Sequence, residues 1–252
     1  LLTDQAAGCG ICIGDFDLDG NPDVYLTHYD RGNRLYRNMG DWRFVDITDE
    51  AGVEGKGRWC AGAVFTDIDN DGDLDLFVCA FNAPNLLYIN EGQGRFRDSA
   101  QDHGLDFSGA SVMMAFADYD LDGDMDGYLV THRLNIGRMA KLPKSSKEAF
   151  QRGLIQVNRQ RQATIGPRYR ELFEVMSKGP GRVELFVAGQ RDYLYRNDGS
   201  GRFTVVNDQA GITGNHIGLA ATWWDYNEDG FPDLYVSNDY RGPDQLWHNN
   251  GN

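Results

Sequence analysis

The chain has 252 residues and a formal net charge of −14 at pH 7, from 38 acidic and 24 basic side chains. A chain of this length can bury a sizeable hydrophobic core. The acidic balance argues against nucleic-acid binding, which requires a basic surface, and the apolar runs are too short to span a membrane.

The first elements along the chain are a short apolar run and an acidic loop. Residues 9–13 read Cys-Gly-Ile-Cys-Ile, which is typical of a buried strand, and residues 15–23 then read Asp-Phe-Asp-Leu-Asp-Gly-Asn-Pro-Asp. Further strands are predicted at 24–27, at 34–38 and from Phe44. The chain therefore begins with four predicted strands, and the acidic loop lies between the first and the second.

The same acidic loop recurs three more times along the chain. All copies follow the pattern Asp-x-Asp/Asn-x-Asp-Gly-x-x-Asp, and they begin at Asp15, Asp67, Asp118 and Asp225. Like charges about 4 Å apart repel each other by roughly 1–4 kcal/mol per pair. Bound Ca²⁺ would relieve this repulsion, because it takes about 6–8 oxygen ligands in flexible geometry. Four acidic surface turns without a metal are the alternative.

The residue types in each loop fit one calcium ion. Side chains at positions 1, 3 and 5 would point inward, glycine at position 6 permits the sharp bend, position 7 offers its carbonyl, and position 9 closes the shell. The predicted ligands are Asp15, Asp17, Asp19, Asn21 (carbonyl) and Asp23; Asp67, Asp69, Asp71, Asp73 (carbonyl) and Asp75; Asp118, Asp120, Asp122, Asp124 (carbonyl) and Asp126; and Asp225, Asn227, Asp229, Phe231 (carbonyl) and Asp233. We expect up to four Ca²⁺ ions, with the fourth site weakest because Asn227 replaces a carboxylate.

An EF-hand begins with a similar loop but differs in its later residues. It requires a glutamate at position 12 and a helix after the loop. Position 12 is occupied here by Leu26, Val78, Leu129 and Val236, within short β-branched and aromatic runs. Because such runs predict strands, an EF-hand is disfavoured.

Each loop belongs to a larger repeat. The first three loops begin 52 and 51 residues apart, a spacing typical of propellers or solenoids. The predicted repeats cover about 8–59, 60–111, 112–217 and 218–252. Four antiparallel strands per repeat describe a β-propeller blade. We therefore predict an all-β fold, either four four-stranded blades or part of a larger, seven-bladed propeller, with a solenoid as the alternative.

Two stretches indicate a known family. Residues 66–78 read Thr-Asp-Ile-Asp-Asn-Asp-Gly-Asp-Leu-Asp-Leu-Phe-Val, and residues 194–203 read Leu-Tyr-Arg-Asn-Asp-Gly-Ser-Gly-Arg-Phe. In these stretches the chain resembles the FG-GAP/VCBS repeat family, and more narrowly its ASPIC/UnbV-associated, cartilage-acidic-protein-like branch. The resemblance covers everything except roughly 134–190. It implies an integrin α-like propeller with calcium loops, protein or glycan partners, and a location that is extracellular, at the cell surface or periplasmic.

The third repeat contains an insertion, near residues 134–190. Its loop and the next begin 107 residues apart, and the added segment carries eleven Lys or Arg and four Glu, which gives +7 against −21 for the rest. Residues 145–148 (Ser-Ser-Lys-Glu) fit a helical capping box, and a second helix is predicted from Pro167 to about Met176. We predict a helical insertion that packs on one face of the propeller.

This insertion has two interpretations. In the first, it is a lid or a partner-binding arm that presents Arg159, Arg161, Arg168 and Arg170 to an acidic partner. In the second, it is a solvated basic face, which is the usual role of a run of charges, or a basic face docked on the chain's own acidic loops.

The last repeat is shorter than the others. It stops at residues 249–252, where the repeat calls for a Gly-Arg-Phe-like continuation into a fourth strand. Either the chain is part of a longer propeller, or residues 1–7 supply the missing strand and close a four-bladed ring. We expect the former, because residues 1–7 lie too close to the first loop to align as a fourth strand.

No catalytic constellation stands out in the sequence. The five histidines share no repeat position, and no nucleophile-elbow or phosphate-loop pattern occurs. We therefore expect a non-enzymatic module for interaction or adhesion. A carbohydrate-active or other enzyme with the insertion as lid, and a purely structural module, are the alternatives. Cys9, Cys12, Cys60 and Cys79 show no zinc-site spacing beyond the single Cys-x-x-Cys of Cys9 and Cys12. We interpret that pair as small buried side chains of an innermost strand, and the disulfide state of all four cysteines stays open.

Overall fold

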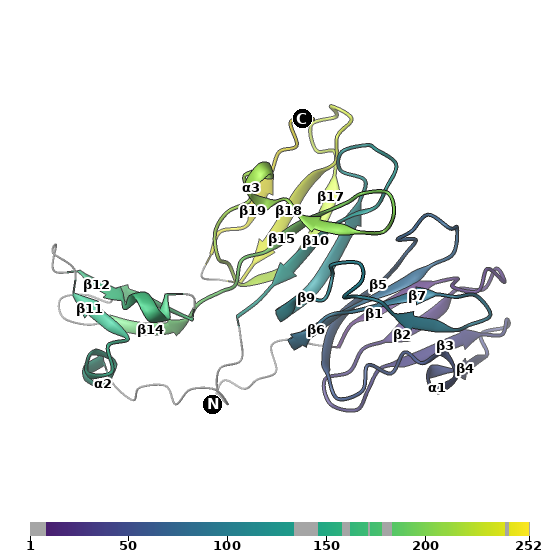
Figure 1. Ribbon diagram of the computed structural model, residues 1–252, viewed down its shortest axis with the longest axis horizontal. Coiled ribbons are helices and arrows are strands. Elements are labelled where there is room, and N and C mark those ends of the chain that lie inside the picture. The colour runs from purple at the N-terminus through teal and green to yellow at the C-terminus, as the bar shows by residue number, and fades with distance from the viewer. Residues whose placement is uncertain are drawn as a thin grey trace.

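The computed structural model describes residues 9–133, 146–157, 162–170, 172–177, 183–239 and 242–251. These residues form mainly antiparallel strands, as the predicted all-β propeller requires (Figure 1). The ribbon colours follow the chain from one sheet to the next, so repeats that are neighbours in sequence are also neighbours in space.

Each repeat folds into a small antiparallel sheet, which we call a blade. Blade 1 contains β1 (Ile11–Gly14), β2 (Asp23–Leu26), β3 (Arg34–Asn38) and β4 (Phe44–Asp46), followed by α1 (Thr48–Ala51). Blade 2 contains β5 (Trp59–Thr66), β6 (Asp75–Pro84), β7 (Leu86–Asn90) and β8 (Phe96–Asp98). Blade 3 contains β9 (Ser108–Ala117), β10 (Asp126–Thr131), β15 (Tyr193–Asn197) and β16 (Phe203–Val205), followed by α3 (Asn207–Ala210). Blade 4 contains β17 (Gly218–Trp224), β18 (Asp233–Asn238) and β19 (Gln245–Trp247) among the described residues.

Blades 2 and 3 are also joined edge to edge. The end of β6 pairs with the start of β9, with Phe81 opposite Ala110 and Pro84 opposite Ser108. This pairing merges the two blades into one curved eight-stranded sheet. It fixes the relative position of their acidic loops.

The hydrophobic core lies between successive blades. Tyr25 and Leu35 of blade 1 are buried against Leu76, Val78 and Tyr88 of blade 2. A second cluster joins blades 2 and 3, and a third joins blades 3 and 4. Because each blade buries its apolar residues only against its neighbours, the blades stabilise one another in series.

No described residue forms such a neighbour for the outer face of blade 1. Ile11 and Ile13 of β1 are 60% and 62% exposed, whereas the equivalent Ala221 of β17 is 6% exposed against blade 3. The described blades therefore form an open series, because blade 4 does not cover blade 1.

Small residues allow the first strands of neighbouring blades to approach closely. A Cβ added to Gly10 would lie 2.6 Å from the carbonyl oxygen of Ala61, and one added to Gly62 would lie 2.4 Å from that of Val112. This close contact explains why the apolar runs before the loops contain glycine and alanine. All four cysteines are free: Cys60 and Cys79 are buried, Cys12 is partly buried and Cys9 is exposed.

The predicted helical insertion is wrong in most of its length. The described part contains the six-residue α2 (Ser146–Gln151), β11 (Ile155–Val157), β12 (Ala163–Ile165), the 3-10 turn η2 (Pro167–Tyr169), β13 (Phe173–Ser177) and β14 (Val183–Val187). The second helix predicted from Pro167 is thus one turn followed by a strand. Alternating aromatic and β-branched residues in β13 and β14 pair with each other, and this pairing outweighs the helical spacing that the sequence also contains.

The insertion has a hydrophobic cluster of its own. Leu154, Ile155, Ile165 and Phe173 are buried together, and every member of this cluster belongs to the insertion. Figure 1 shows the insertion beside the blades rather than flat against one face, contrary to the expected packing. Phe150, Leu154 and Val157 follow the capping box at helical spacing, but Val157 lies on β11 and is 57% exposed. None of the described helices has the length and apolar composition that crossing a bilayer requires.

A polar brace recurs where the second strand of each blade turns into the third. In each blade, one carboxamide or carboxylate oxygen accepts a backbone N–H group from an earlier residue. The donor lies five or six residues earlier in blades 1, 2 and 4, and much earlier in the sequence in blade 3. The four acceptors are Asn33, Asn85, Asp192 and Asp244. In blade 3, Thr131 N–H donates to Asp192 Oδ1 at 2.6 Å, and the Tyr128 hydroxyl donates to Asp192 Oδ2 at 3.1 Å. In blade 1, by contrast, Asn33 Nδ2 donates to the hydroxyl of Tyr25.

This comparison predicts that Asp192→Asn stabilises the protein near neutral pH. Burial raises the pKa of Asp192 from 3.8 to about 6, so the folded state favours the protonated form. The stabilisation of the folded state by protonated Asp192 is fully present below the pKa that Asp192 has in the unfolded chain. It is lost as the pH rises through about 6. At pH 7 we expect the variant to unfold with a free energy about 1–3 kcal/mol higher than wild type.

Urea unfolding of both proteins between pH 4 and 7 measures this difference. The advantage of the variant should shrink as the pH approaches 4. If the difference in unfolding free energy between variant and wild type stayed constant across this range, ionisation of Asp192 would not destabilise the folded state.

Candidate metal sites

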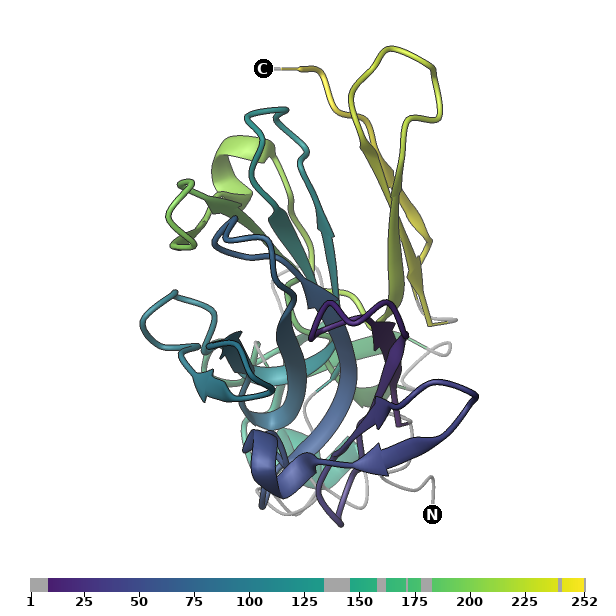
Figure 2. The same cartoon turned by 90° about the vertical axis from the view of Figure 1, so that its right-hand side faces the viewer.

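The four acidic loops have the same backbone conformation. The predicted glycine at position 6 is left-handed in each, with φ of 88° at Gly20, 93° at Gly72, 98° at Gly123 and 94° at Gly230. Position 4 is left-handed as well, although it is not glycine: φ is 58° at Leu18, 61° at Asn70, 59° at Leu121 and 60° at Glu228. In Figure 2 the loops of blades 3 and 4 project next to each other at the top of the molecule.

The aspartate at position 1 holds the turn closed. Its Oδ1 accepts the N–H of position 5, and its Oδ2 accepts the N–H of position 6. For Asp15 these distances are 3.0 and 2.8 Å, and for Asp118 both are 3.0 Å. Asp67 and Asp225 make the same pair of bonds. The loop backbone is therefore arranged around the first carboxylate.

Three of the loops bring three carboxylates together. One oxygen from each aspartate at positions 1, 3 and 5 lies within 4.8 Å of the others, in the triads Asp15-Asp17-Asp19, Asp67-Asp69-Asp71 and Asp118-Asp120-Asp122. Oδ1 of Asp17 and Oδ1 of Asp69 are buried and have no hydrogen-bond partner among the described residues. An all-oxygen set with unpartnered buried oxygens fits a hard cation such as Ca²⁺.

Crowding of carboxylates changes their acidity in the second loop. Burial raises the pKa of Asp69, and the neighbouring Asp71 and Asp67 raise it further. The pKa of Asp73, at position 7, is raised to about 6 by burial and by the same aspartates. A bound cation would favour the ionised form of each of these groups.

The aspartate at position 9 is buried and has a second role. The four residues are at most 1% exposed. Asp75 Oδ2 accepts the N–H of Ile68 at 3.0 Å, and its Oδ1 accepts the N–H of Asn90 at 2.8 Å. Asp23, Asp126 and Asp233 bond equivalently. Position 9 thus joins the loop to the third strand, and each oxygen keeps a lone pair for a metal.

Burial also raises the pKa of Asp23, Asp75 and Asp126. That of Asp23 rises to about 6, and those of Asp75 and Asp126 rise to about 7. In each case the two backbone N–H donors oppose the rise, because they stabilise the carboxylate.

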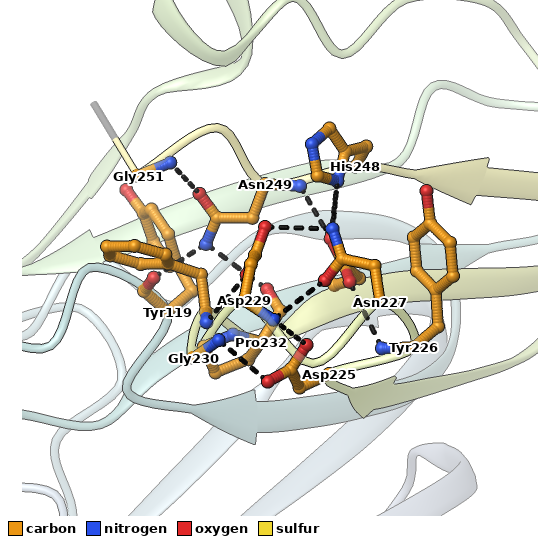
Figure 3. Close-up of polar contacts among 12 residues, drawn as sticks. Tyr119, Asp225, Tyr226, Asn227, Asp229, Gly230, Pro232, His248, Asn249 and Gly251 are labelled. Atoms are coloured by element: carbon orange, nitrogen blue, oxygen red, sulfur yellow. Dashed lines mark hydrogen bonds and ion pairs between the residues drawn. The ribbon is translucent and has the colours of Figure 1, made fainter.

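The fourth loop lacks the triad of carboxylates (Figure 3). Asn227 stands at position 3, and its Nδ2 donates to Asp229 Oδ2 at 2.8 Å. His248 Nδ1 lies 3.1 Å from Asp233 Oδ1 and 3.4 Å from Asn227 Nδ2. The amide of Asn227 therefore contacts the carboxylate at position 5, and the imidazole of His248 contacts the carboxylate at position 9.

An arginine side chain from the third strand lies beside the first loop. Arg37 on β3 lies 2.6 Å from Asp17 and 3.4 Å from Asp19. Sequence reasoning missed this residue, whose equivalents in the other blades are Ile89, Arg196 and His248. Because its guanidinium neutralises part of the first triad, that triad is less anionic than the second, where Ile89 occupies the equivalent position.

An asparagine connects the loops of neighbouring blades. Asn90 Nδ2 donates to the carbonyl of Leu74 in its own loop at 3.2 Å and to that of Phe16 in the preceding loop at 2.9 Å. Asn197 bridges to Ile68, and Asn249 bridges to Tyr119 (Figure 3), in the same way. Among the described residues, Asn38 Nδ2 donates only within its own blade, to Pro22 at 3.0 Å. The part of the chain that the structure describes therefore has three bridged copies and one unbridged copy of the same residue.

We expect Asn90→Ala to destabilise the protein more than Asn38→Ala. The two side chains make matching bonds within their blades, and only Asn90 also satisfies the buried Phe16 carbonyl. An unsatisfied buried carbonyl costs about 1–3 kcal/mol. Chemical unfolding of both variants measures this difference, and equal losses would show that the bridge contributes nothing to stability.

The blades and loops together define a class. Antiparallel blades that bury their cores against one another, each with an acidic loop between its first two strands, make this chain a β-propeller repeat protein. Residues 15–78, 67–129 and 179–236 match the FG-GAP-like repeat, and the chain belongs to this family.

Several known proteins are similar to part of the chain. Cartilage acidic protein 1 of Mus musculus is 29% identical over 128 residues, which is 50% of this chain and 20% of that protein. The Homo sapiens protein is 30% identical over 128 residues, or 19% of its length. The matched segment thus spans about a fifth of the curated relatives.

One solved structure aligns with nearly the whole chain. It belongs to a study of an Agrocybe aegerita lectin and its specific recognition of non-reducing terminal N-acetylglucosamine. The alignment covers 98% of this chain and 67% of that one, with 18% identity and a TM-score of 0.34. A TM-score this low carries no weight for fold or function.

Proposed function

We propose that this chain is a calcium-stabilised propeller module that acts outside the cytosol and binds a protein or glycan partner without catalysing a reaction. The observation that supports it most is the recurrence of one carboxylate triad at the same place in three successive blades. A catalytic pair of carboxylates would be needed once. A set repeated in each blade fits a structural ion instead.

The aspartates of each loop would have different roles in binding the ion. Aspartates at positions 3 and 5 would supply free carboxylate oxygens, while position 1 keeps the loop closed around them. Position 9 transmits this arrangement to the third strand. Bound Ca²⁺ would supply the positive charge that offsets the repulsion among the carboxylates.

The kind of site supports the proposed location outside the cytosol. Extracellular calcium modules bind Ca²⁺ with dissociation constants of about 10⁻⁴–10⁻³ M, which suits exposed loops such as these. The name of the cartilage acidic protein 1 relatives also points to an extracellular tissue matrix. We extend this location, including the cell surface or periplasm, to the present chain.

We place partner contact on the insertion. It carries the basic residues that break the acidic pattern, with +7 over residues 134–190. Arg170 is exposed, and so are Phe150 and Val157. Of the other arginines predicted to contact a partner, Arg159 and Arg161 lie outside the described residues, as does the side chain of Arg168. Basic and apolar groups on a projecting arm suit an acidic protein or glycan.

A reciprocal exchange at position 3 tests calcium binding. Asp69→Asn gives the second loop the residue of the fourth, and Asn227→Asp gives the fourth loop the residue of the others. We expect the first change to weaken one calcium site and the second to strengthen another, measured by calorimetric titration. Asp102→Asn, an exposed aspartate outside the loops, is the control with equal loss of charge.

Thermal unfolding provides a second measure of calcium binding. At free Ca²⁺ 100-fold above its dissociation constant, each site adds about 2.7 kcal/mol, so EDTA should lower the melting temperature of wild type. A melting temperature that is indifferent to EDTA and to added Ca²⁺ would rule out the calcium proposal.

Removing the insertion tests the partner surface. Residues 134–187 are replaced by a short glycine-serine turn, while Ala188 to Gln190 stay because the Gln190 side chain accepts the N–H of Ala110 at 2.5 Å. We expect wild type to be retained on heparin, an acidic glycan, at low salt and the deletion variant to flow through, with calcium titration unchanged. Arg170→Glu should reduce retention by less. Equal retention of wild type and deletion variant would exclude the insertion as a site for acidic glycans.

A further inference from the structure

One position of the third strand differs in charge from blade to blade. It directly precedes the asparagine at the end of that strand, and its residues in blades 1 to 4 are Arg37, Ile89, Arg196 and His248. The acidic loops beside these strands share one backbone conformation. This position is therefore a marked difference between sites that otherwise match.

In blade 1 the guanidinium contacts both carboxylates that would supply free oxygens to an ion. Nη2 of Arg37 lies 2.6 Å from Asp17 Oδ2 and 3.4 Å from Asp19 Oδ2. The other oxygen of Asp19, Oδ1, accepts the backbone N–H group and the side-chain amide of Asn21, each at 2.9 Å. Both oxygens at position 5 are therefore engaged, and one of them faces a positive charge.

The second and third loops retain the oxygen that the first loop gives to arginine. Oδ1 of Asp71 and Oδ1 of Asp122 accept the N–H group of position 7, at 3.0 and 3.1 Å. Within the described parts of the chain, no lysine or arginine forms an ion pair with either aspartate. In blade 2 the side chain equivalent to arginine is that of Ile89, which is buried and uncharged.

Blade 3 shows that an arginine at this position does not always contact its loop. Arg196 is exposed, and over the described residues no ion pair joins it to Asp120 or Asp122. The chain thus contains two arginines at one repeat position, of which only Arg37 is held in an ion pair with its loop.

A cavity gives the side chain of Arg37 room to move. It lies between blades 1 and 2, has a volume of about 390 Å³, and is lined by Arg37 together with Phe16, Ile47 and Glu50 among others. Glu50 is exposed and offers a second carboxylate in the same cavity. Nε of Arg37 is buried and has no hydrogen-bond partner among the described residues, so it does not anchor the guanidinium in its present place.

The interface between blades 2 and 3 differs at the corresponding place. A Cβ added to Gly201 would lie 3.0 Å from Nδ1 of His103. A Cβ added to the equivalent Gly94, which lines the cavity, would meet only a ring atom of Phe16, at 3.8 Å. The imidazole therefore fills in the second interface a space that stays open in the first.

We propose that Arg37 is a resident counter-ion of the first acidic loop, which Ca²⁺ must displace in order to bind there. This inference rests on the calcium binding proposed above. Displacement of the guanidinium toward Glu50 adds to the cost of binding at the first loop, and any positive charge left near the ion repels it. The third-strand residue thus sets the order in which the loops fill. The first loop requires more Ca²⁺ than the second, although each has a full carboxylate triad.

Glycine resonances can follow each loop separately. The glycine at position 6 donates its N–H group to the aspartate at position 1 in all four loops. Calcium-free protein labelled with ¹⁵N-glycine therefore has one reporter per loop, namely Gly20, Gly72, Gly123 and Gly230. In a titration with CaCl₂ we expect the midpoint of Gly20 to lie at a concentration at least ~10-fold above that of Gly72.

Substitution of the arginine isolates the effect of its charge. The first loop also has Asn21 where the second has Asp73, so the order of filling in wild type does not identify the cause. Arg37→Gln and Arg37→Ile, the residue of blade 2, should lower the midpoint of Gly20 at least ~5-fold and leave that of Gly72 unchanged. Arg37→Lys retains the charge and should keep the midpoint of Gly20 within ~2-fold of wild type.

The same change in blade 3 is the matched control. Arg196→Gln removes an arginine from the equivalent position, where no ion pair with the described part of the loop exists. It should move the midpoint of Gly123 by less than ~2-fold, because an exposed charge outside direct contact is screened by solvent.

The outcomes separate this inference from the calcium proposal. An unchanged midpoint of Gly20 in both neutral variants would overturn the role of Arg37 and leave calcium binding intact. An effect of Arg196→Gln on Gly123 as large as that of Arg37→Gln on Gly20 would show that the ion pair is irrelevant. If no glycine resonance moved in any loop, the calcium proposal itself would fail, and the inference with it.

Discussion

The buried aspartate at the end of each acidic loop is the group on which the rest of the structure depends. Asp23, Asp75, Asp126 and Asp233 each accept two backbone N–H groups, one from the start of their own loop and one from the end of the third strand. A carboxylate offers a separate acceptor oxygen to each of the two donors, whereas an asparagine would place its own amide N–H group against one of them. It therefore fixes the loop relative to the sheet and sets the position of the carboxylates before it. The loop conformation and the blade are one structural unit.

Asparagine bridges and interblade cores extend this unit from blade to blade. Asn90 ties the first loop to the second, and Asn70 Nδ2 donates across to Asp124 Oδ1 at 2.5 Å between the second and third. Because these polar contacts lie beside the apolar clusters between the same blades, an ion held in one loop acts on a surface shared with its neighbour. The insertion, by contrast, has a separate cluster, so its sequence can vary without disturbing the blades.

The sequence predicts the features that repeat and that depend on nearby residues. It does not predict the features that depend on contacts between segments far apart in the chain. Spacing alone locates the loops, the left-handed glycines such as Gly72 and the strands on either side. It does not show that Leu18 and Glu228 are also left-handed, because neither residue type favours that conformation. The ion pair of Arg37 with Asp17 joins a strand to a loop, and no local pattern marks it. In the insertion, β13 and β14 form because they pair with each other. The helical spacing near Phe150 corresponds to one short helix, α2.

The bridging asparagine has a consequence for how such a protein can change over generations. The second and third repeats each carry both halves of the joint, since the loop offers a carbonyl to the next repeat and the asparagine reaches back to the one before. A gene duplication that copies one whole repeat therefore creates a new blade that already matches both neighbours. Loss of one whole repeat leaves the flanking pair equally well matched. Unequal recombination can thus lengthen or shorten the array without inventing an interface, whereas an exchange within a repeat separates an asparagine from the loop it was selected with.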